Sequence, residues 1–197
     1  AIQKDDTLYF CIGDVSGTGM PASLFMAQAT RLFHSLASQN MTPAEICNIM
    51  NNELSGEENE QGMFVTMFIC RLNLKLNLLE YCNAGHNPPV LGNVDGQLSF
   101  IDVEPNAPIG LWPELNYVGE SIDFFKERLL FLYTDGLNEA EDTEQNQFGD
   151  ERLLDILRQT CFESAKQVIE VMTQNVELHR NGAEPNDDLT MLCLRIK

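Results

Sequence analysis

The sequence predicts an α+β fold, in which helices pack in layers on antiparallel sheets. Pairs of helix-forming segments alternate with stretches of short apolar segments that are separated by turn residues. A parallel sheet would instead need a helix after nearly every strand. Hydrophobic residues make up 44% of the 197 residues, which is typical of a globular domain and excludes a disordered chain.

The first predicted elements are a buried strand and a helix. Residues 8–12 form a continuous apolar run that stops just before Asp14. A helix is predicted over residues 21–38, because apolar residues recur on one face and Pro21 takes a first-turn position that tolerates proline. An acidic residue therefore stands where a buried strand turns towards a helix.

A second helix is predicted over residues 42–54. Thr42 is a typical N-cap residue, Pro43 takes the first helical position and Glu45 can complete a capping box. The acidic stretch 55–62, which contains glycine, has no periodicity and predicts a solvated loop.

The middle of the chain predicts an antiparallel meander of short strands. A hairpin-like turn at residues 93–96 separates the last two strands. The predicted strands are residues 63–72, 78–84, 88–92 and 97–102.

The rest of the chain combines strands and helices again. A proline-rich loop at 104–113 precedes it. The predicted elements are strands at 117–122 and 128–134, helices at 150–157 and 164–179, and a last strand at 189–196.

The charge and the cysteines restrict the class of protein. The formal net charge of −18 would repel nucleic acids and anionic lipids, and no basic patch offsets it. No apolar run is long enough to span a bilayer. The six cysteines stand singly in apolar runs, as reduced core residues do, without metal-binding spacing. We therefore expect a cytoplasmic domain that contacts neither nucleic acid nor membrane.

Acidic residues stand at the boundaries of three predicted strands. Asp14 and Asp135 each follow an apolar strand, and the pair Asp187 and Asp188 precedes the last one. Mg²⁺ and Mn²⁺ prefer carboxylate and carbonyl oxygens, and small neighbours such as Gly136 let the backbone approach an ion. Each aspartate alone is equally explained by the preference of this residue for turns. Their joint occurrence favours a metal site.

Seven segments resemble, in order, the motifs of the metal-dependent protein phosphatases (PPM), in their bacterial SpoIIE/RsbU-like branch. The resemblance spans nearly the whole chain, and the seven motifs together are specific. The segments are GDVSGTGMPASLFMA at 13–27, FVTMFICRLN at 64–73, NAGHNPP at 83–89, NAPIG at 106–110, LLFLYTDGLNEAED at 129–142, FGDERL at 148–153 and NDDLTMLCLRI at 186–196.

The resemblance implies a four-layer αββα sandwich, with two antiparallel sheets flanked by helices and a two-metal site at one end. Asp14 would bridge two Mn²⁺ or Mg²⁺ ions, and the backbone carbonyl of Val15 would bind one of them. Asp135 and Asp187 would bind the other, with Asp188 in a supporting role. These carboxylates would be the catalytic residues, because a metal-activated water replaces an enzyme nucleophile.

Neighbouring residues admit two interpretations each. Gly17 either places backbone N–H groups near the metals or serves a plain strand-to-helix turn. His86 is either a general acid or ligand, or a loop histidine that fixes the backbone. Thr66 and Thr190 either position water or acids, or are ordinary strand residues.

The sequence also departs from the family pattern. Family members usually have His or Lys where this chain has Thr18. The family carries an upstream Gly-Gly-Asp segment that this sequence does not contain, and Asp5 and Asp6 lie in a turn instead. The resemblance therefore implies that residues 1–197 are one phosphatase domain, an N-terminally truncated fragment that lacks its first strand. A sensor or coiled-coil segment would precede it in the parent protein.

Three functions follow from these observations, of which the third is a different two-metal phosphoesterase that acts on small molecules. The first is hydrolysis of phosphoserine or phosphothreonine on a partner protein in bacterial signalling, where the substrate in the family is often a phosphorylated anti-sigma-factor antagonist. The alternative is a non-catalytic binding module that keeps the fold and recruits a regulatory partner. Retention of three mutually repelling acids, Asp14, Asp135 and Asp187, argues for the enzyme.

Overall fold

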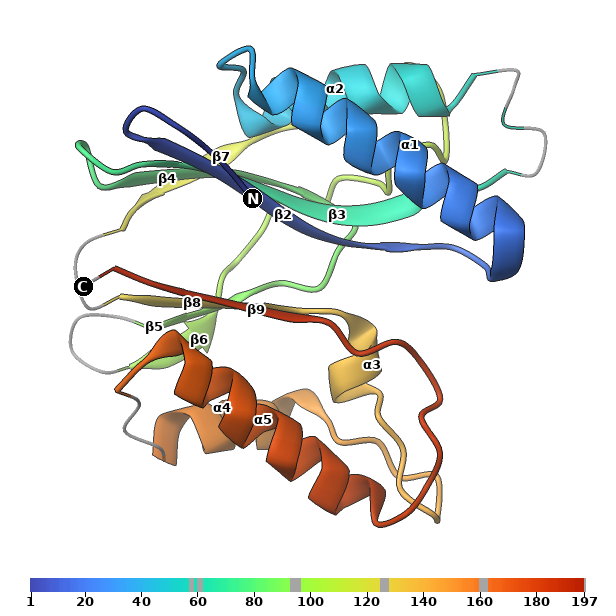
Figure 1. Cartoon of the computed structure of the whole chain (residues 1–197), viewed down its shortest axis with the longest axis vertical. Helices are drawn as coiled ribbons and strands as arrows, with labels where there is room; N and C mark the ends of the chain where they lie inside the picture. The colour runs from blue at the N-terminus through green and yellow to red at the C-terminus, as the bar shows by residue number, and fades with distance from the viewer. Residues whose placement is uncertain (57–58, 60–61, 93–96, 125–127, 160–162, 197) are drawn as a thin grey trace. The chain divides into compact units, whose positions relative to one another are not determined.

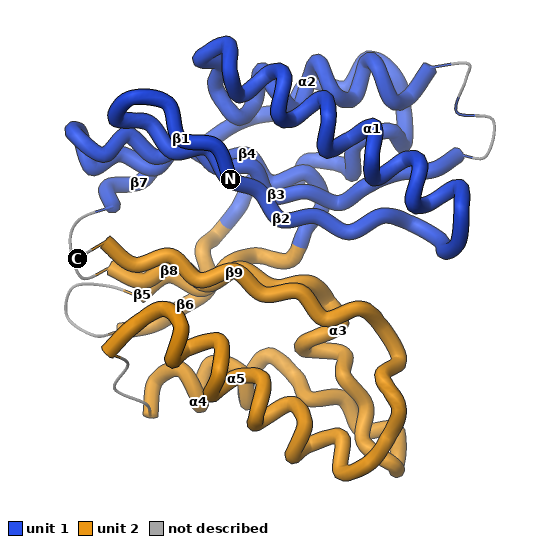
Figure 2. Tube along the Cα trace, in the orientation of Figure 1, with its two compact units in different colours: residues 1–86, 103–124 blue, residues 87–102, 125–197 orange. Residues whose placement is uncertain are grey.

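The computed structural model describes residues 1–56, 59, 62–92, 97–124, 128–159 and 163–196 (Figure 1). The chain forms two compact units (Figure 2). Unit 1 consists of residues 1–86 and 103–124, and unit 2 of residues 87–102 and 125–197. Each unit contains one antiparallel sheet and a pair of longer helices, which confirms the predicted α+β class with two antiparallel sheets. No helix in the described ranges is long and apolar enough to cross a membrane.

Unit 1 is built on a five-stranded antiparallel sheet in the order β1-β2-β3-β4-β7. In the pairing of the second and third strands, Asp14 lies opposite Thr66 and Val15 lies opposite Val65. The strands are β1 (Ile2–Lys4), β2 (Thr7–Val15), β3 (Val65–Asn73), β4 (Leu78–Ala84) and β7 (Glu120–Asp123).

Two helices, α1 (Gly19–Ala37) and α2 (Pro43–Leu54), cover one face of this sheet (Figure 1). The predicted capping box is confirmed. The backbone N–H of Glu45 donates to the Thr42 hydroxyl at 3.3 Å, and the Glu45 carboxylate accepts from the Thr42 N–H at 2.8 Å. The buried core beneath the helices includes Phe25, Phe33, Ile46, Met50 and Ile69.

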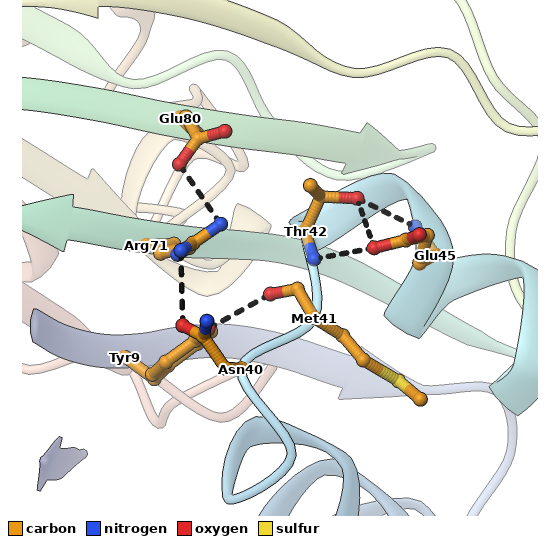
Figure 3. A network of polar contacts seen from close by, with 7 residues as sticks. All are labelled: Tyr9, Asn40, Met41, Thr42, Glu45, Arg71 and Glu80. Carbon is orange, nitrogen blue, oxygen red and sulfur yellow. Dashed lines mark hydrogen bonds and ion pairs between the residues drawn. The ribbon is translucent and has the colours of Figure 1, made fainter.

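A polar network fixes the loop between α1 and α2 to the sheet (Figure 3). The Tyr9 hydroxyl donates to the carbonyl oxygen of Met41 at 2.8 Å. The guanidinium of Arg71 donates to the Asn40 side chain at 3.0 Å and pairs with Glu80 at 3.4 Å. The strands β2, β3 and β4 thus position the helix pair by polar contacts as well as by the apolar core.

Unit 2 is built on a four-stranded antiparallel sheet in the order β6-β5-β8-β9, and two of its helices cover one face (Figure 1). The strands are β5 (Val90–Gly92), β6 (Leu98–Phe100), β8 (Leu129–Tyr133) and β9 (Met191–Arg195). The helices are α3 (Asp135–Asn138), α4 (Asp150–Gln159) and α5 (Ala165–Arg180). The long helices α4 and α5 confirm the predicted segments, and their apolar faces form a core with β8.

The structure differs from the sequence prediction in three places. Strand β1, which pairs with Thr7–Tyr9, and the single-turn helix α3 were not predicted. The strand predicted from Tyr117 begins only at Glu120, because the N–H of Tyr117 donates instead to the Asn48 side chain on α2 at 2.9 Å. The turn predicted at 93–96 lies outside the described residues.

Candidate metal centre

Asp14 and Val15 are the last two residues of β2, at the sheet end that leads into α1. A side chain at Gly13 would place its Cβ 2.7 Å from the carbonyl oxygen of Thr66, so glycine lets the two strands approach here. Beyond the strand, the N–H of Ser16 donates to the Phe64 carbonyl at 2.9 Å. The position of the Asp14 backbone is therefore set on both sides by pairing with β3.

The turn after Asp14 requires glycine for its backbone conformation. Gly17 has φ of 78° and Gly19 has φ of 79°, in the left-handed region that favours glycine. Thr18 is the N-cap of α1, and its side chain makes no capping hydrogen bond. The conformation accounts for Gly17 as a turn residue, and its contribution of an N–H group near a metal stays a prediction.

His86 is linked to Asp14 through Thr66. The Thr66 hydroxyl lies 2.9 Å from Nδ1 of His86 and 3.4 Å from the Asp14 carbonyl oxygen. When the hydroxyl donates to that carbonyl, its oxygen can accept the Nδ1–H of the imidazole. The histidine is only 6% exposed. Its backbone is held by Asn83, whose side chain accepts from the His86 N–H at 2.8 Å and donates to the His86 carbonyl at 3.0 Å.

These contacts favour the structural interpretation of His86, in which the residue fixes a loop. They also show that Thr66 connects β2 to the histidine, whereas a role of this threonine in positioning water or acids stays a prediction. Asn83 was not singled out from the sequence. The only signal for it was its place at the start of the NAGHNPP motif.

In unit 2, Asp135 opens α3 directly after β8. Thr134, the preceding residue, holds the segment that leads into β9. Its hydroxyl donates to the Asp188 carbonyl at 3.0 Å and accepts from the Thr190 N–H at 3.0 Å, while its own N–H donates to the Thr190 carbonyl at 3.0 Å. Asp135 and Asp188 are thereby held in neighbouring backbone segments.

Gly136 lies against the same segment. A Cβ at this position would stand 2.4 Å from the Asp188 carbonyl oxygen and 3.3 Å from the Leu189 nitrogen. Only glycine allows this approach without a shift of the backbone. Glycine at position 136 thus allows the two segments to pack closely, and its supporting role at a metal site stays a prediction.

Asp187 and Asp188 lie in an exposed loop that is fixed by Asn186. The Asn186 amide donates to the Glu139 carbonyl at 2.9 Å and accepts from the Glu141 N–H at 3.4 Å. The Asp187 carboxylate accepts the N–H of Asp188 at 2.7 Å. Sequence reasoning gave no role to Asn186 or Thr134, because their contacts are with residues that lie more than 40 positions away.

The carboxylate of Asp135 has the features of a cation ligand. Its Oδ1 is buried and accepts no hydrogen bond from the described residues. Burying a carboxylate oxygen without a donor is unfavourable, and a bound cation offsets this because it supplies positive charge.

Additional oxygen ligands are needed at this turn. Within the ranges that the structure describes, no three His, Cys, Asp or Glu side chains form a metal-binding group. Mg²⁺ is usually bound by one or two carboxylates and keeps several waters. Joint coordination of metals by the predicted carboxylates of Asp14, Asp135 and Asp187 therefore stays a prediction.

Four of the described cysteines have thiols that are poor nucleophiles near neutral pH. Burial raises the pKa of the Cys11 thiol to about 11 and that of Cys193 to about 12. Burial also raises the pKa of Cys47 and Cys70 well above the ordinary value. A thiol with a raised pKa stays protonated near neutral pH, so these side chains are core residues as predicted.

Comparison with known proteins identifies the family. The family model described as Stage II sporulation protein E (SpoIIE) matches residues 4–197. The chain belongs to the SpoIIE family. This confirms the predicted SpoIIE/RsbU-like branch of the metal-dependent phosphatase domains. It also accounts for the order of the seven motifs along the chain.

Two curated relatives have similar sequences. The chain is 24% identical to Protein IcfG of Synechocystis, over 96% of this chain and 34% of that protein. It is also 24% identical to phosphoserine phosphatase RsbU of Bacillus subtilis, over 100% of this chain and 58% of that protein. The SpoIIE-family chain thus spans between a third and about 60% of the length of these relatives.

Solved structures show the fold. The SiaA-PP2C domain of Pseudomonas aeruginosa aligns with a TM-score of 0.84 and 17% identity, over 100% of this chain and 78% of that chain. The PP2C phosphatase domain of SpoIIE from Bacillus subtilis aligns with a TM-score of 0.82 and 18% identity, over 96% and 55%. A Mycobacterium tuberculosis protein with RsbU and RsbW domains aligns with a TM-score of 0.76 and 22% identity, over 96% and 52%. The fold is therefore that of PP2C-type domains.

Proposed function

We propose that this chain is a phosphatase domain that uses Mn²⁺ or Mg²⁺ to hydrolyse phosphoserine or phosphothreonine on a partner protein. Membership of the SpoIIE family and similarity to a relative named phosphoserine phosphatase support the reaction class. The observation that carries the proposal is the buried Oδ1 of Asp135, which lacks a donor among the described residues at a strand end where the sequence predicts a metal ligand.

The proposed ligands are the predicted aspartates and one backbone carbonyl. Asp14 would bridge the two cations and the Val15 carbonyl, at the end of β2, would bind one of them. Asp135 and Asp187 would bind the other, with Asp188 in support. The position of Asp14 and Val15 within β2 supports their part of this assignment, because ligands on regular elements are held more precisely than ligands on loops.

The part of the chain in this reaction is to hold the metal-binding carboxylates in place. When bound, two divalent cations supply a water with a lowered pKa and neutralise charge on the phosphoryl oxygens. Thr134 keeps the Asp188 segment against the turn that carries Asp135. Gly136 allows the close approach of these two segments. Gly17 would let the backbone turn away from Asp14.

The proposed partners are regulatory proteins. A phosphorylated protein, for which an anti-sigma-factor antagonist is the leading candidate, would be the substrate. The similar Mycobacterium tuberculosis protein, whose chain includes an RsbW domain beside the RsbU domain, supports a partner of this regulatory class. An upstream sensor or coiled-coil segment in the parent protein would supply the input, in the cytoplasm.

Hydrolysis of an aryl phosphate and of a phosphoserine peptide, measured with and without Mn²⁺, tests the proposal. Asp14→Asn and Asp135→Asn should each lower kcat/KM at least about 100-fold, since a catalytic metal contributes several kcal/mol and each ~1.4 kcal/mol is a factor of ten. Asp155→Asn, an exposed aspartate on α4, is the matched control and should retain activity.

Two outcomes would overturn the proposal. Turnover that needs no metal, or that Asp14→Asn leaves unaltered, would exclude the two-metal assignment. Binding of the phosphopeptide without turnover at saturating Mn²⁺ would favour the non-catalytic binding module instead.

A further inference from the structure

The helix that carries Asp135 depends on tertiary contacts for its position. Helix α3 has four residues, and an isolated helix of this length is not stable in water. Its N-cap residue, Thr134, makes no capping hydrogen bond, because the hydroxyl is engaged with residues 188 and 190. What holds the far end of α3 therefore affects where the Asp135 carboxylate lies.

The far end of α3 is held by Asn138. Its amide donates to Oδ1 of Asp150 at 3.0 Å, and its side-chain oxygen accepts from Asn87 at 3.2 Å. Its backbone carbonyl accepts the N–H of Gly149 at 2.8 Å. Three contacts thus connect the last residue of α3 to neighbouring segments of unit 2.

Asp150 contacts the chain on both sides of Asp135. The oxygen that accepts from Asn138 also accepts from the Tyr133 hydroxyl at 3.3 Å. Tyr133 is only 1% exposed, so its ring is fixed in the core of the unit. One carboxylate oxygen therefore joins a residue two positions before Asp135 to a residue three positions after it.

We propose that Asp150 is a positioning residue for the metal-binding carboxylate of Asp135, acting through the hydroxyl of Tyr133 and the amide of Asn138. This inference rests on the proposed function, in which Asp135 binds a metal. Groups that orient a ligand from outside the coordination sphere contribute substantially to metal affinity. The FGDERL motif at 148–153, which the phosphatase chemistry itself does not use, acquires a role in this way.

A simpler role for Asp150 is stabilisation of α4. Asp150 and Glu151 both lie in the first turn of that helix, where negative charge interacts favourably with the helix dipole. The two roles differ in what they require. Helix stabilisation needs a charge in the first turn, whereas positioning needs an acceptor oxygen at residue 150.

The test measures Mn²⁺ binding to the whole chain by calorimetry and the Mn²⁺ dependence of aryl phosphate hydrolysis. Asp150→Ala and Asn138→Ala should each weaken Mn²⁺ binding at the site of Asp135 by about tenfold or more. Asp150→Asn keeps the acceptor oxygen and should stay within about twofold of wild type by the same reasoning. Glu151→Ala removes a neighbouring charge and should also behave as wild type.

Circular dichroism establishes that each variant is folded. If the alanine variants do not fold, Tyr133→Phe replaces them, because it removes one hydroxyl and keeps the ring in the core. This variant should also weaken Mn²⁺ binding. Unchanged Mn²⁺ affinity in folded Asp150→Ala and Asn138→Ala would overturn the inference, and so would an equal loss in Glu151→Ala.

The same measurements distinguish failure of the proposed function from failure of the positioning role. If wild type binds no Mn²⁺, or if Asp135→Asn binds it as wild type does, the metal assignment of Asp135 itself is wrong. If Asp135→Asn loses the metal while Asp150→Ala keeps full affinity, only the positioning role is wrong.

Discussion

Substitution of Gly136 by alanine should separate the two segments that carry the acids of unit 2. The new Cβ would stand 2.4 Å from the Asp188 carbonyl oxygen, whereas ordinary contacts begin at 3.4 Å, so the segments must move apart by about 1 Å. That movement would break the 3.0 Å hydrogen bond from the Thr134 hydroxyl to the same oxygen.

The expected loss of stability combines opposing effects. Overpacking of this kind costs about 1–3 kcal/mol, and loss of one hydrogen bond costs about 1 kcal/mol. In the opposite direction, alanine stabilises a helix by about 0.5–1 kcal/mol relative to glycine. We expect Gly136→Ala to lower the free energy of unfolding by about 1–3 kcal/mol. Its activity should fall by about 100-fold, because a 1 Å displacement of a catalytic group has effects of that size.

Urea denaturation and Mn²⁺-dependent hydrolysis measure these two quantities. Gly56→Ala is the matched control, since a Cβ there meets no atom of the described residues within 4 Å and the backbone needs no left-handed conformation. Its stability should stay within about 0.5 kcal/mol of wild type. The steric account of Gly136 would be refuted if Gly136→Ala matched this control in both stability and activity.

Three further predictions concern unit 1. Thr42→Ala removes the N-cap of α2 and should lower the free energy of unfolding in urea by about 1 kcal/mol, while Thr42→Ser should not. Asn51 is fully buried, and its side-chain oxygen accepts from the Gly110 N–H and the Tyr117 hydroxyl. Asn51→Ala should therefore lower the free energy of unfolding by about 2–3 kcal/mol. A loss below about 0.5 kcal/mol would contradict this. Hydrogen bonds from Thr42 lower the pKa of Glu45 below its usual 4.5, so its contribution to stability is complete above pH 4.5 and is lost as the pH falls through the lowered pKa. Glu45→Gln should therefore flatten the acid side of the stability profile, and an unchanged profile would argue against the capping contact.

The elements that the sequence predicted well are those fixed by local interactions. The capping box depends on Thr42 and Glu45, three residues apart, and both contacts form as expected. Strand β8 is buried along its whole length, as its continuous apolar run predicted, and it ends at Tyr133, two residues before Asp135. Periodicity and turn residues carry such information within a short window.

The elements that the sequence did not predict depend on distant partners. Thr134 contacts Asp188, which lies 54 positions further along the chain. The segment at Tyr117 joins α2 through the Asn48 side chain, 69 positions away, instead of extending a strand. Local strand and helix propensities do not predict such contacts, because hydrogen bonds between distant residues override these propensities.

The candidate site was predicted in the same uneven way. The aspartates could be recognised because each stands at a strand boundary in a motif of the family. The groups that hold them, Thr66 in unit 1 and Asn186 in unit 2, are ordinary polar residues whose role appears only through their contacts. Joint coordination of metals by Asp14 and Asp135 stays a prediction.

A crystal structure of the chain with Mn²⁺, using the anomalous signal of manganese, tests that prediction most directly. Binding of two metals should give two peaks about 3.5–4 Å apart. The Asp14 carboxylate should lie between both peaks, and Asp135 and Asp187 should contact one of them. Manganese sites at saturating concentration that involve neither Asp14 nor Asp135 would show that these aspartates are not the metal ligands.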